Sequence, residues 1–441
     1  MKIKLAFLSV SLLLSLMLVV VLPIAANPLT QYGADFATPT LNAVGAIDFD
    51  IVSVGGSLET LAYPAERIGA FQIGETQARS DYPNGATFLM TVEATEPITN
   101  VSLIVRYPHN SGTRAIAQPT SITNQWQALL YEQPGQPPWQ EFDFFWRITD
   151  AQGVTVESTP HHFVYSDPTR VWFKAETPLL KLYWFGADAE IATVAMQGMV
   201  AVHERYVQGF GKPLSYTPVA VLFPDLASFA EFAGGGTSGA SRRAGFTSNQ
   251  LGMTVQRLGT VGVTFSCPAY PPATEQTLQW LYESTTTTIT HEVAHLYQFE
   301  NNINGPTWFI EGGATWFSTN PTRGRQEGLR DRPADADLPT LQGYGPSTGG
   351  FTPNGCNALA YWMGASFINY IYGAYGMEAI GTWQDLIGSN FTMDDALIQV
   401  TGKDLAALEG DWRTYLGLTT EVYVMPTPAY QFLPSPTPFG Q

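Results

Sequence analysis

The sequence predicts a multidomain chain in which an antiparallel β-sandwich is followed by an α+β domain. Its 441 residues are enough for two sizeable hydrophobic cores. From Phe49 to about Asp167, short segments alternate apolar and polar residues between turn signals. Beyond residue 172, apolar strand segments are interleaved with amphipathic helical segments. We therefore place the sandwich at residues 27–172 and the second domain at residues 173–418.

The two ends of the chain differ in composition from the rest. Two lysines precede an apolar run at residues 5–22, and small residues follow it, as in a secretory signal peptide cleaved near Ala26. A run of this length also suffices to cross a bilayer, so residues 1–26 are either a cleaved signal or an uncleaved N-terminal membrane anchor. In both cases we expect an exported protein, extracellular or in the cell envelope. The Pro-rich residues 419–441 are expected to form a flexible tail.

Within the predicted sandwich, residues 87–94 and 101–107 alternate with period two, as half-buried strands do. Residues 142–149, a turn, and residues 154–158 then form a predicted hairpin. We interpret this region as an immunoglobulin-like sandwich without the internal disulfide of antibody domains. No residue in it has the spacing of a ligand set or a catalytic set, which favours a spacer or docking module over an active domain.

Charge and cysteine content limit the possible partners. The net charge is -17, with 38 acidic against 21 basic residues, which argues against nucleic acid and anionic membrane surfaces as partners.

The two cysteines, Cys267 and Cys356, lie on either side of the central motif described next. One disulfide and two separate buried thiols both remain open, because the sequence does not give their distance. The oligomeric state is not indicated.

The central motif is a pair of histidines with a glutamate between them, at His291, Glu292 and His295. On a helix, four residues turn about 400° and rise about 6 Å, so the two imidazoles lie one turn apart on one face and can bind one metal ion. Glu292 lies beside that face, where it can take a proton from a water molecule without being a ligand. A half-buried helix with two chance histidines is the alternative, but six histidines in 441 residues make this spacing rare by chance. The motif predicts a zinc site.

A third zinc ligand is expected downstream, because the four other histidines lie upstream of the motif and outside any pattern. After an Asn-rich break, Gly305 can end the first helix and Pro306 can open a second. Glu311 is the only acid in that apolar second helix, a costly position unless the carboxylate is paired or bound to a metal. We expect the helical hairpin to bring Glu311 beside the histidines. The alternative is a buried glutamate bonded to polar neighbours.

These residues resemble the gluzincin zinc metallopeptidases. The pattern His291-Glu292-x-x-His295 followed by Trp308-x-x-Glu311-Gly312-x-Ala314 is most similar to the peptidase MA-like families of exported bacterial proteins. The resemblance implies an α+β zincin-type metallopeptidase domain that binds one Zn²⁺ per chain through the two histidines and Glu311. It also implies that Glu292 is the general base and acid in hydrolysis of a peptide or protein substrate.

The chain departs from the family pattern at two points. Thr315 stands one turn after Glu311, where thermolysin-type enzymes carry an aspartate. The sequence therefore does not identify the group that orients the metal-binding histidine. The Gly-x-Met-Glu-Asn exopeptidase motif is absent, so endopeptidase and exopeptidase remain alternatives. Related enzymes supply an oxyanion donor from a Tyr or His of the helical lobe, and Tyr361 matches such a tyrosine loosely. A tyrosine of the core is the alternative.

Two expectations concern the elements around the motif. Residues 246–255 are predicted as the third strand of the second domain, and an edge strand of such a domain can pair with a substrate peptide. The zinc helix is expected to begin near Glu275 or, because residues 285–290 are all β-branched, nearer Ser284. Two rival hypotheses are a non-catalytic zinc-containing envelope binding protein with a zincin fold, and a hydrolase of ester or glycan bonds.

Overall fold

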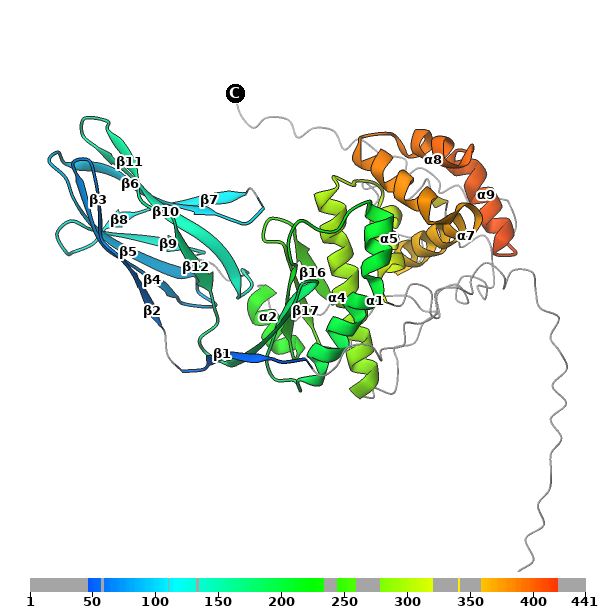
Figure 1. Cartoon of the computed structure of the whole chain (residues 1–441), viewed down its shortest axis with the longest axis horizontal. Helices are drawn as coiled ribbons and strands as arrows, with labels where there is room; N and C mark the ends of the chain where they lie inside the picture. Colours follow the sequence, from blue (N-terminus) through cyan, green and yellow to red (C-terminus); the bar gives the residue numbers. More distant parts are fainter. Residues whose placement is uncertain are drawn as a thin grey trace, which may run out of the picture.

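The computed structural model describes residues 47–56, 59–109, 111–131, 135–233, 244–258, 278–319, 340–341 and 358–418. Over these residues the chain forms three β-sheets and a group of helices packed on one of them (Figure 1). The predicted signal segment, the Pro-rich tail, Cys267 and Cys356 lie outside the described residues. Within them, no helix is both long enough and apolar enough to cross a membrane.

The sheet that carries the site has six strands, and an antiparallel strand forms each of its two edges. Its order is β1 (Asp50–Val54), β13 (Val171–Thr177), β14 (Leu180–Trp184), β15 (Val219–Phe223), β17 (Met253–Arg257) and β16 (Gly245–Ser248). The ladders β14–β15 and β15–β17 are parallel, and the others are antiparallel. The central strand β15, which pairs in parallel on both sides, is apolar at successive positions because both faces of the sheet are covered.

The predicted single strand at residues 246–255 is wrong in its extent. The chain instead forms the hairpin β16–β17, in which Leu251 and Gly252 lie in the turn. Gly252 adopts a positive φ of 60°, a conformation that glycine accepts at low cost. The hairpin makes β16 an edge strand antiparallel to its only ladder partner among the described residues.

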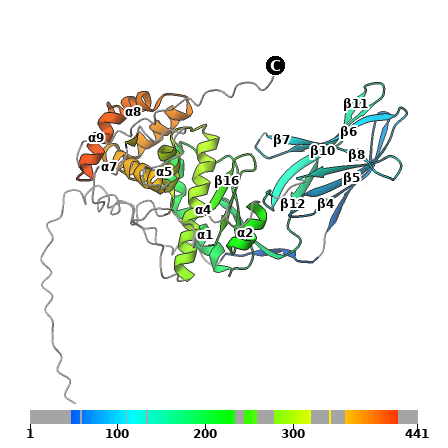
Figure 2. The same ribbon diagram turned by 180° about the vertical axis from the view of Figure 1, so that it is seen from behind.

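Side chains alternate between the two faces of this sheet and feed two separate cores. Leu182, Ala220 and Leu222 join the helices in one cluster, and Tyr183, Val221 and Phe223 join the other. The helices of the first cluster are α1 (Glu190–Phe210), α4 (Leu278–Glu300), α5 (Thr307–Phe317), α7 (Ala358–Gly388, interrupted at Gly376), α8 (Met393–Thr401) and α9 (Leu405–Tyr415). Helix α2 (Leu226–Ala233) packs on the opposite face (Figure 2).

In the sequence, Asp188 is a candidate N-cap and Gly211 a candidate end for the helical segment between them. Gly211, with a φ of 78°, does end α1. The cap by Asp188 does not form, because Ala189 occupies the N-cap position and no side chain caps the helix there.

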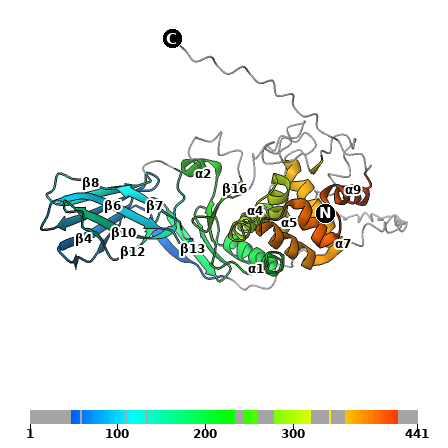
Figure 3. The same ribbon diagram turned by 90° about the horizontal axis from the view of Figure 1, so that it is seen from above.

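The N-terminal β-rich region consists of two antiparallel sheets around an aromatic core, and it lies beside the six-stranded sheet (Figure 3). One sheet contains β2 (Thr60–Tyr63), β3 (Glu66–Ile68), β4 (Phe71–Ser80), β5 (Ala86–Glu93), β8 (Gln118–Pro119) and β9 (Gln125–Leu130). The other contains β6 (Ile98–Arg106), β7 (Gly112–Ile116), β10 (Gln140–Asp150), β11 (Thr155–Glu157) and β12 (His161–Tyr165). Phe88, Phe144 and Trp146 are fully buried between the sheets.

One strand within the range predicted for the sandwich belongs elsewhere. Although β1 lies inside residues 27–172, it pairs with β13 of the six-stranded sheet. Phe49, just before it, contacts Phe173 and Trp184 edge-on at centroid distances of 5.6 and 5.9 Å. The chain therefore contributes the strand β1 to the six-stranded sheet before it enters the β-rich region.

Helix α4 continues through the β-branched run at residues 285–290, so a start nearer Ser284 is excluded. Its threonine hydroxyls donate to main-chain carbonyls one turn earlier, as Thr287 Oγ1 does to Glu283 O at 2.9 Å and Thr290 Oγ1 to Thr286 O at 2.9 Å. These bonds satisfy the hydroxyls of Thr287 and Thr290 within the helix. Close packing against α1 adds to this, because a Cβ on Gly198 would lie only 2.2 Å from Thr286 Cγ2.

Candidate metal centre

Three potential ligand atoms converge between α4 and α5. Glu311 Oε2 lies 3.2 Å from His291 Nε2 and 3.3 Å from His295 Nε2. Two ligands bound tetrahedrally to zinc at its usual bond lengths are about 3.3 Å apart. The side chains of His291, His295 and Glu311 are 14%, 11% and 25% exposed, so these residues are mostly buried but remain partly accessible to solvent. We call His291, His295 and Glu311 the ligand group. Its ligand atoms and the distances between them fit one zinc ion.

The turn between α4 and α5 brings Glu311 to this position. Helix α4 ends at Glu300, and Asn302 adopts a left-handed φ of 53° while Ile303 N donates to Gln298 O at 2.8 Å. This bond pattern closes a helix C-terminus. The predicted end at Gly305 is therefore wrong, since an asparagine tolerates the left-handed conformation and reverses the chain earlier. Pro306 stands at the N-cap of α5, close to its predicted place.

Gln298 fixes the orientation of the His295 ring. Its amide nitrogen donates to Ile310 O at 2.9 Å, which leaves its oxygen facing His295 Nδ1 at 2.7 Å. His295 Nδ1 must then carry a proton, so Nε2, which faces Glu311, is the nitrogen that can bind a metal ion once its own proton is lost. Gln298 is 2% exposed, so water does not compete for this bond.

Thr315 has the corresponding role for His291. Its Oγ1 lies 3.3 Å from His291 Nδ1, and the residue is 2% exposed. With Nε2 directed at the ligand group, Nδ1–H donates to the hydroxyl. The position at which thermolysin-type enzymes place an aspartate therefore still contacts the histidine, through a neutral acceptor. Within the described residues, both histidines are oriented by neutral oxygens, and Glu311 supplies the negative charge of the ligand set.

Glu292 lies beside the ligand group and is held from β16. Thr247 Oγ1 is 2.5 Å from Glu292 Oε2 and 3.0 Å from Glu292 O. Glu292 is 9% exposed, and its carboxylate is not among the three atoms that converge. Its placement leaves it available for proton transfer.

Tyr361 packs directly on the ligand group. Its ring stacks on that of His291, with centroids 5.8 Å apart and planes at 22°. Burial, the nearby carboxylates and a side-chain hydrogen bond to Glu311 all raise the pKa of Tyr361 above its ordinary value. The tyrosine therefore stays protonated and acts as a donor.

A glycine contact between α5 and α7 explains why Tyr361 reaches the site. A Cβ on Gly364 would lie 1.8 Å from Trp308 O, and one on Gly312 would lie 2.4 Å from Gly364 Cα. The two helix backbones therefore touch at this point, one turn along α7 from Tyr361 and one residue from Glu311. Such close approach requires residues without a side chain.

Without a metal ion, charge interactions favour an ion pair between Glu311 and His295. Burial opposes ionisation of Glu311, but its hydrogen bonds and attraction to His291 and His295 outweigh burial and lower its pKa well below the ordinary value. Burial likewise opposes protonation of His295, yet Glu311, Glu292 and Gln298 raise the pKa of His295 to about 9. A divalent cation would replace the proton that the ion pair retains.

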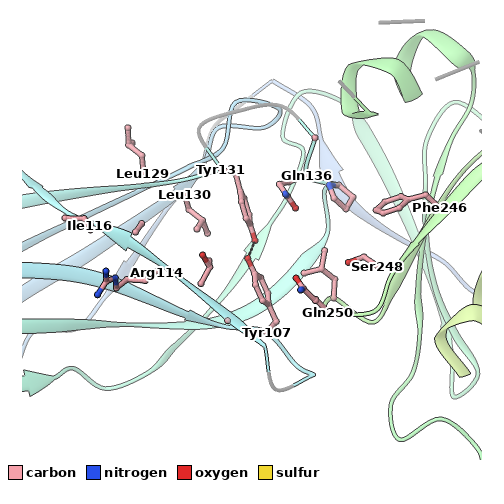
Figure 4. Close-up of a pocket in the computed structure, with 16 residues that line it drawn as sticks. Tyr107, Arg114, Ile116, Leu129, Leu130, Tyr131, Gln136, Phe246, Ser248 and Gln250 are labelled. Atoms are coloured by element: carbon pink, nitrogen blue, oxygen red, sulfur yellow. Dashed lines mark hydrogen bonds between the residues drawn. The ribbon is translucent and has the colours of Figure 1, made fainter. Parts of the chain in front are cut away.

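A separate cavity of about 880 Å³ lies between the β-rich region and the edge of the six-stranded sheet (Figure 4). Among the residues that line it are Tyr107, Tyr131, Gln136, Phe246, Ser248 and Gln250. Tyr107 and Tyr131 point toward each other, and their hydroxyls share a hydrogen bond. Phe246 and Ser248 alternate with Gly245 and Thr247 along β16, so the cavity and the ligand group lie on opposite faces of that strand.

The structure brings together all five residues singled out from the sequence, His291, Glu292, His295, Glu311 and Tyr361. Sequence reasoning missed Gln298 and Thr247. Gln298 lies three residues after His295, on the same helix face, which is a usable signal. Thr247 is 45 residues from Glu292 and carries no local signal, because its contact depends on the hairpin register.

Comparison with known proteins gives a limited result. No protein-family model matches the chain. No curated protein matches it either. Among solved structures, it is similar to an M1 zinc metallopeptidase from Deinococcus radiodurans, with 11% identity, 80% of this chain and 91% of that chain covered, and a TM-score of 0.31. It is also similar to an aminopeptidase N family protein from Idiomarina loihiensis, with 10% identity, coverage of 82% and 72%, and a TM-score of 0.31. TM-scores in this range do not establish a common fold.

Proposed function

We propose that the chain is an exported, zinc-dependent hydrolase of peptide bonds with a zincin-type second domain. The observation that carries the proposal is the separation between the three converging ligand atoms and the neighbouring carboxylate of Glu292. Three atoms of His291, His295 and Glu311 converge at zinc-like spacing, while Glu292 is held beside them and outside the ligand set. A purely structural zinc site has four protein ligands and no adjacent free carboxylate.

The proposed chemistry assigns a role to each side chain. Zinc bound by the three ligands would polarise the scissile carbonyl and lower the pKa of a water molecule toward about 7. Glu292 accepts that water's proton and delivers it to the leaving amine. Gln298 and Thr315 keep the two imidazoles in the tautomer that presents Nε2. Tyr361, which is held protonated, is the candidate donor to the developing oxyanion.

We propose that substrate binds along the free edge of β16, the side of that strand that pairs with no other strand among the described residues. Arg257 N donates to Ala244 O at 3.1 Å, which fixes the phase of the β16–β17 ladder. The main-chain groups of Phe246 and Ser248 therefore bond to β17, and those of Gly245 and Thr247 point to the free edge. An extended peptide can add there by main-chain hydrogen bonds. We propose the β-rich region as an immunoglobulin-like spacer or docking module.

The decisive experiment compares Glu292→Gln with the wild-type chain. Zinc content is measured by mass spectrometry, and cleavage is profiled on a mixed peptide library. We expect about one zinc in both proteins and loss of cleavage in Glu292→Gln only. Loss of zinc in the variant, or retained cleavage, would contradict the role of Glu292. Zinc binding without any cleavage by the wild type would favour a non-catalytic envelope binding protein. Turnover of esters or glycans without peptide cleavage would favour a hydrolase of those bonds.

A further inference from the structure

In the part of the chain that the structure describes, the hydroxyl of Thr247 makes two hydrogen bonds, and both are with Glu292. Its Oγ1 lies 2.5 Å from Glu292 Oε2 and 3.0 Å from the main-chain oxygen of the same residue. A hydroxyl has one proton to donate, and the shorter bond to a charged oxygen is the stronger. The proton therefore goes mainly to the carboxylate and fixes one of its two oxygens.

Gly245, on the same face of β16, leaves space for the other carboxylate oxygen. A Cβ at Gly245 would lie 3.1 Å from Glu292 Oε1 and 3.2 Å from Glu292 Cγ, closer than most Cβ contacts. Residues two apart on a strand share a face, so Thr247 and Gly245 flank the carboxylate together. Thr247 donates a hydrogen bond to the carboxylate, and Gly245 leaves the volume beside it unfilled.

The same two residues direct their main-chain groups to the free edge of the sheet. Any peptide that pairs with β16 would order these residues, and through them the side chain that contacts Glu292. We propose that Thr247 is the positioning residue for Glu292, and that substrate pairing along β16 and placement of the general base are coupled through its hydroxyl. This inference rests on the proposed function and assigns to Thr247 the placement of the Glu292 carboxylate.

A simpler role for Thr247 would be to tie the edge strand to α4 through the main-chain oxygen of Glu292. The two roles differ in what they predict for turnover. A tie between elements affects stability and peptide binding, whereas a displaced base lowers kcat at unchanged zinc content and KM. A displacement of about 1 Å can lower a rate by about 100-fold.

The test uses full-length wild-type protein, Thr247→Val and Thr247→Ser, with a fluorogenic peptide chosen from the library profile. Thr247→Val keeps the shape of the side chain and removes the hydroxyl. We expect kcat to fall between about 10-fold and 100-fold in Thr247→Val, KM to change less than about twofold, and zinc content to stay at one. Thr247→Ser restores kcat to within about threefold. Ser248→Ala, which removes a hydroxyl from the opposite face, is the matched control and stays within about twofold of wild type.

A double-variant comparison and a structure separate this inference from the proposed function. In the Glu292→Gln background, Thr247→Val should cause no further loss of residual rate, because the group that it positions is gone. Crystal structures of zinc-loaded wild type and Thr247→Val should show a displaced Glu292 carboxylate in the variant only. An unmoved carboxylate, or an unchanged kcat in an active enzyme, overturns the inference. A displaced carboxylate in a protein whose wild type cleaves no peptide supports the positioning contact and refutes the peptidase function.

Discussion

Gly364→Ala tests the helix contact that places Tyr361 and Glu311 together. The added Cβ would lie 1.8 Å from Trp308 O, whereas ordinary contacts begin at 3.4 Å, so α7 must move from α5 by about 1.6 Å. Overpacking of a close-packed site costs about 1–3 kcal/mol, occasionally more, and the gain in helix propensity from glycine to alanine returns about 1 kcal/mol. Because the overlap is with a main-chain oxygen, the cost lies toward the upper end, about 2–3 kcal/mol, so we expect net destabilisation of about 1–2 kcal/mol with loss of the bond from Tyr361 to Glu311.

Gly410→Ala in α9 is the matched control, since a Cβ there meets nothing within 4 Å. This change should stabilise the protein by about 0.5–1 kcal/mol. Urea denaturation of the zinc-loaded and metal-free proteins measures both effects. A Gly364→Ala variant as stable as wild type would show that α5 and α7 do not touch at this point.

Three further predictions concern the metal centre. Glu311→Gln should hold substoichiometric zinc by mass spectrometry, because a neutral amide is a poor third ligand, and full occupancy would refute Glu311 as a ligand. Gln298→Leu should bind zinc about 10-fold to 100-fold more weakly in a chelator competition with its secondary structure intact, since His295 Nδ1–H loses its acceptor; unchanged affinity would exclude the orienting role. In the metal-free chain the pKa of His295 is raised to about 9, so zinc must displace a proton at neutral pH. Zinc affinity should therefore rise with pH up to about 9, and calorimetry in buffers of different ionisation enthalpy should detect proton release; pH-independent affinity from 7 to 9 would contradict the ion pair.

The sequence predicts the ligand residues well because their geometry is local. Four residues along one helix put His291 and His295 on one face, whatever the rest of the fold does. A lone acid in the apolar segment 307–317 is costly without a partner, and this singles out Glu311. The separation of Glu292 from the ligand set follows from the same helical period.

The parts that escape the sequence depend on competition between residues or on tertiary register. Asn302 and Gly305 can both end a helix, and only the bond from Ile303 N to Gln298 O decides between them. Residues 246–255 end in the strand-like run Leu251–Val255, but the turn at residues 249–252, with a positive φ at Gly252, divides the segment into two strands. Thr247 contacts Glu292 only because the hairpin register turns it toward α4.

Anomalous diffraction at the zinc absorption edge tests the central claim most directly. Crystals of the full chain, grown without added chelator, should show one anomalous peak per chain at about 2.0–2.2 Å from His291 Nε2, His295 Nε2 and Glu311 Oε2. Glu292 should lie outside bonding distance of that peak. A peak bound by Glu292 in place of Glu311, or no peak between α4 and α5 in zinc-supplemented crystals, would contradict the account.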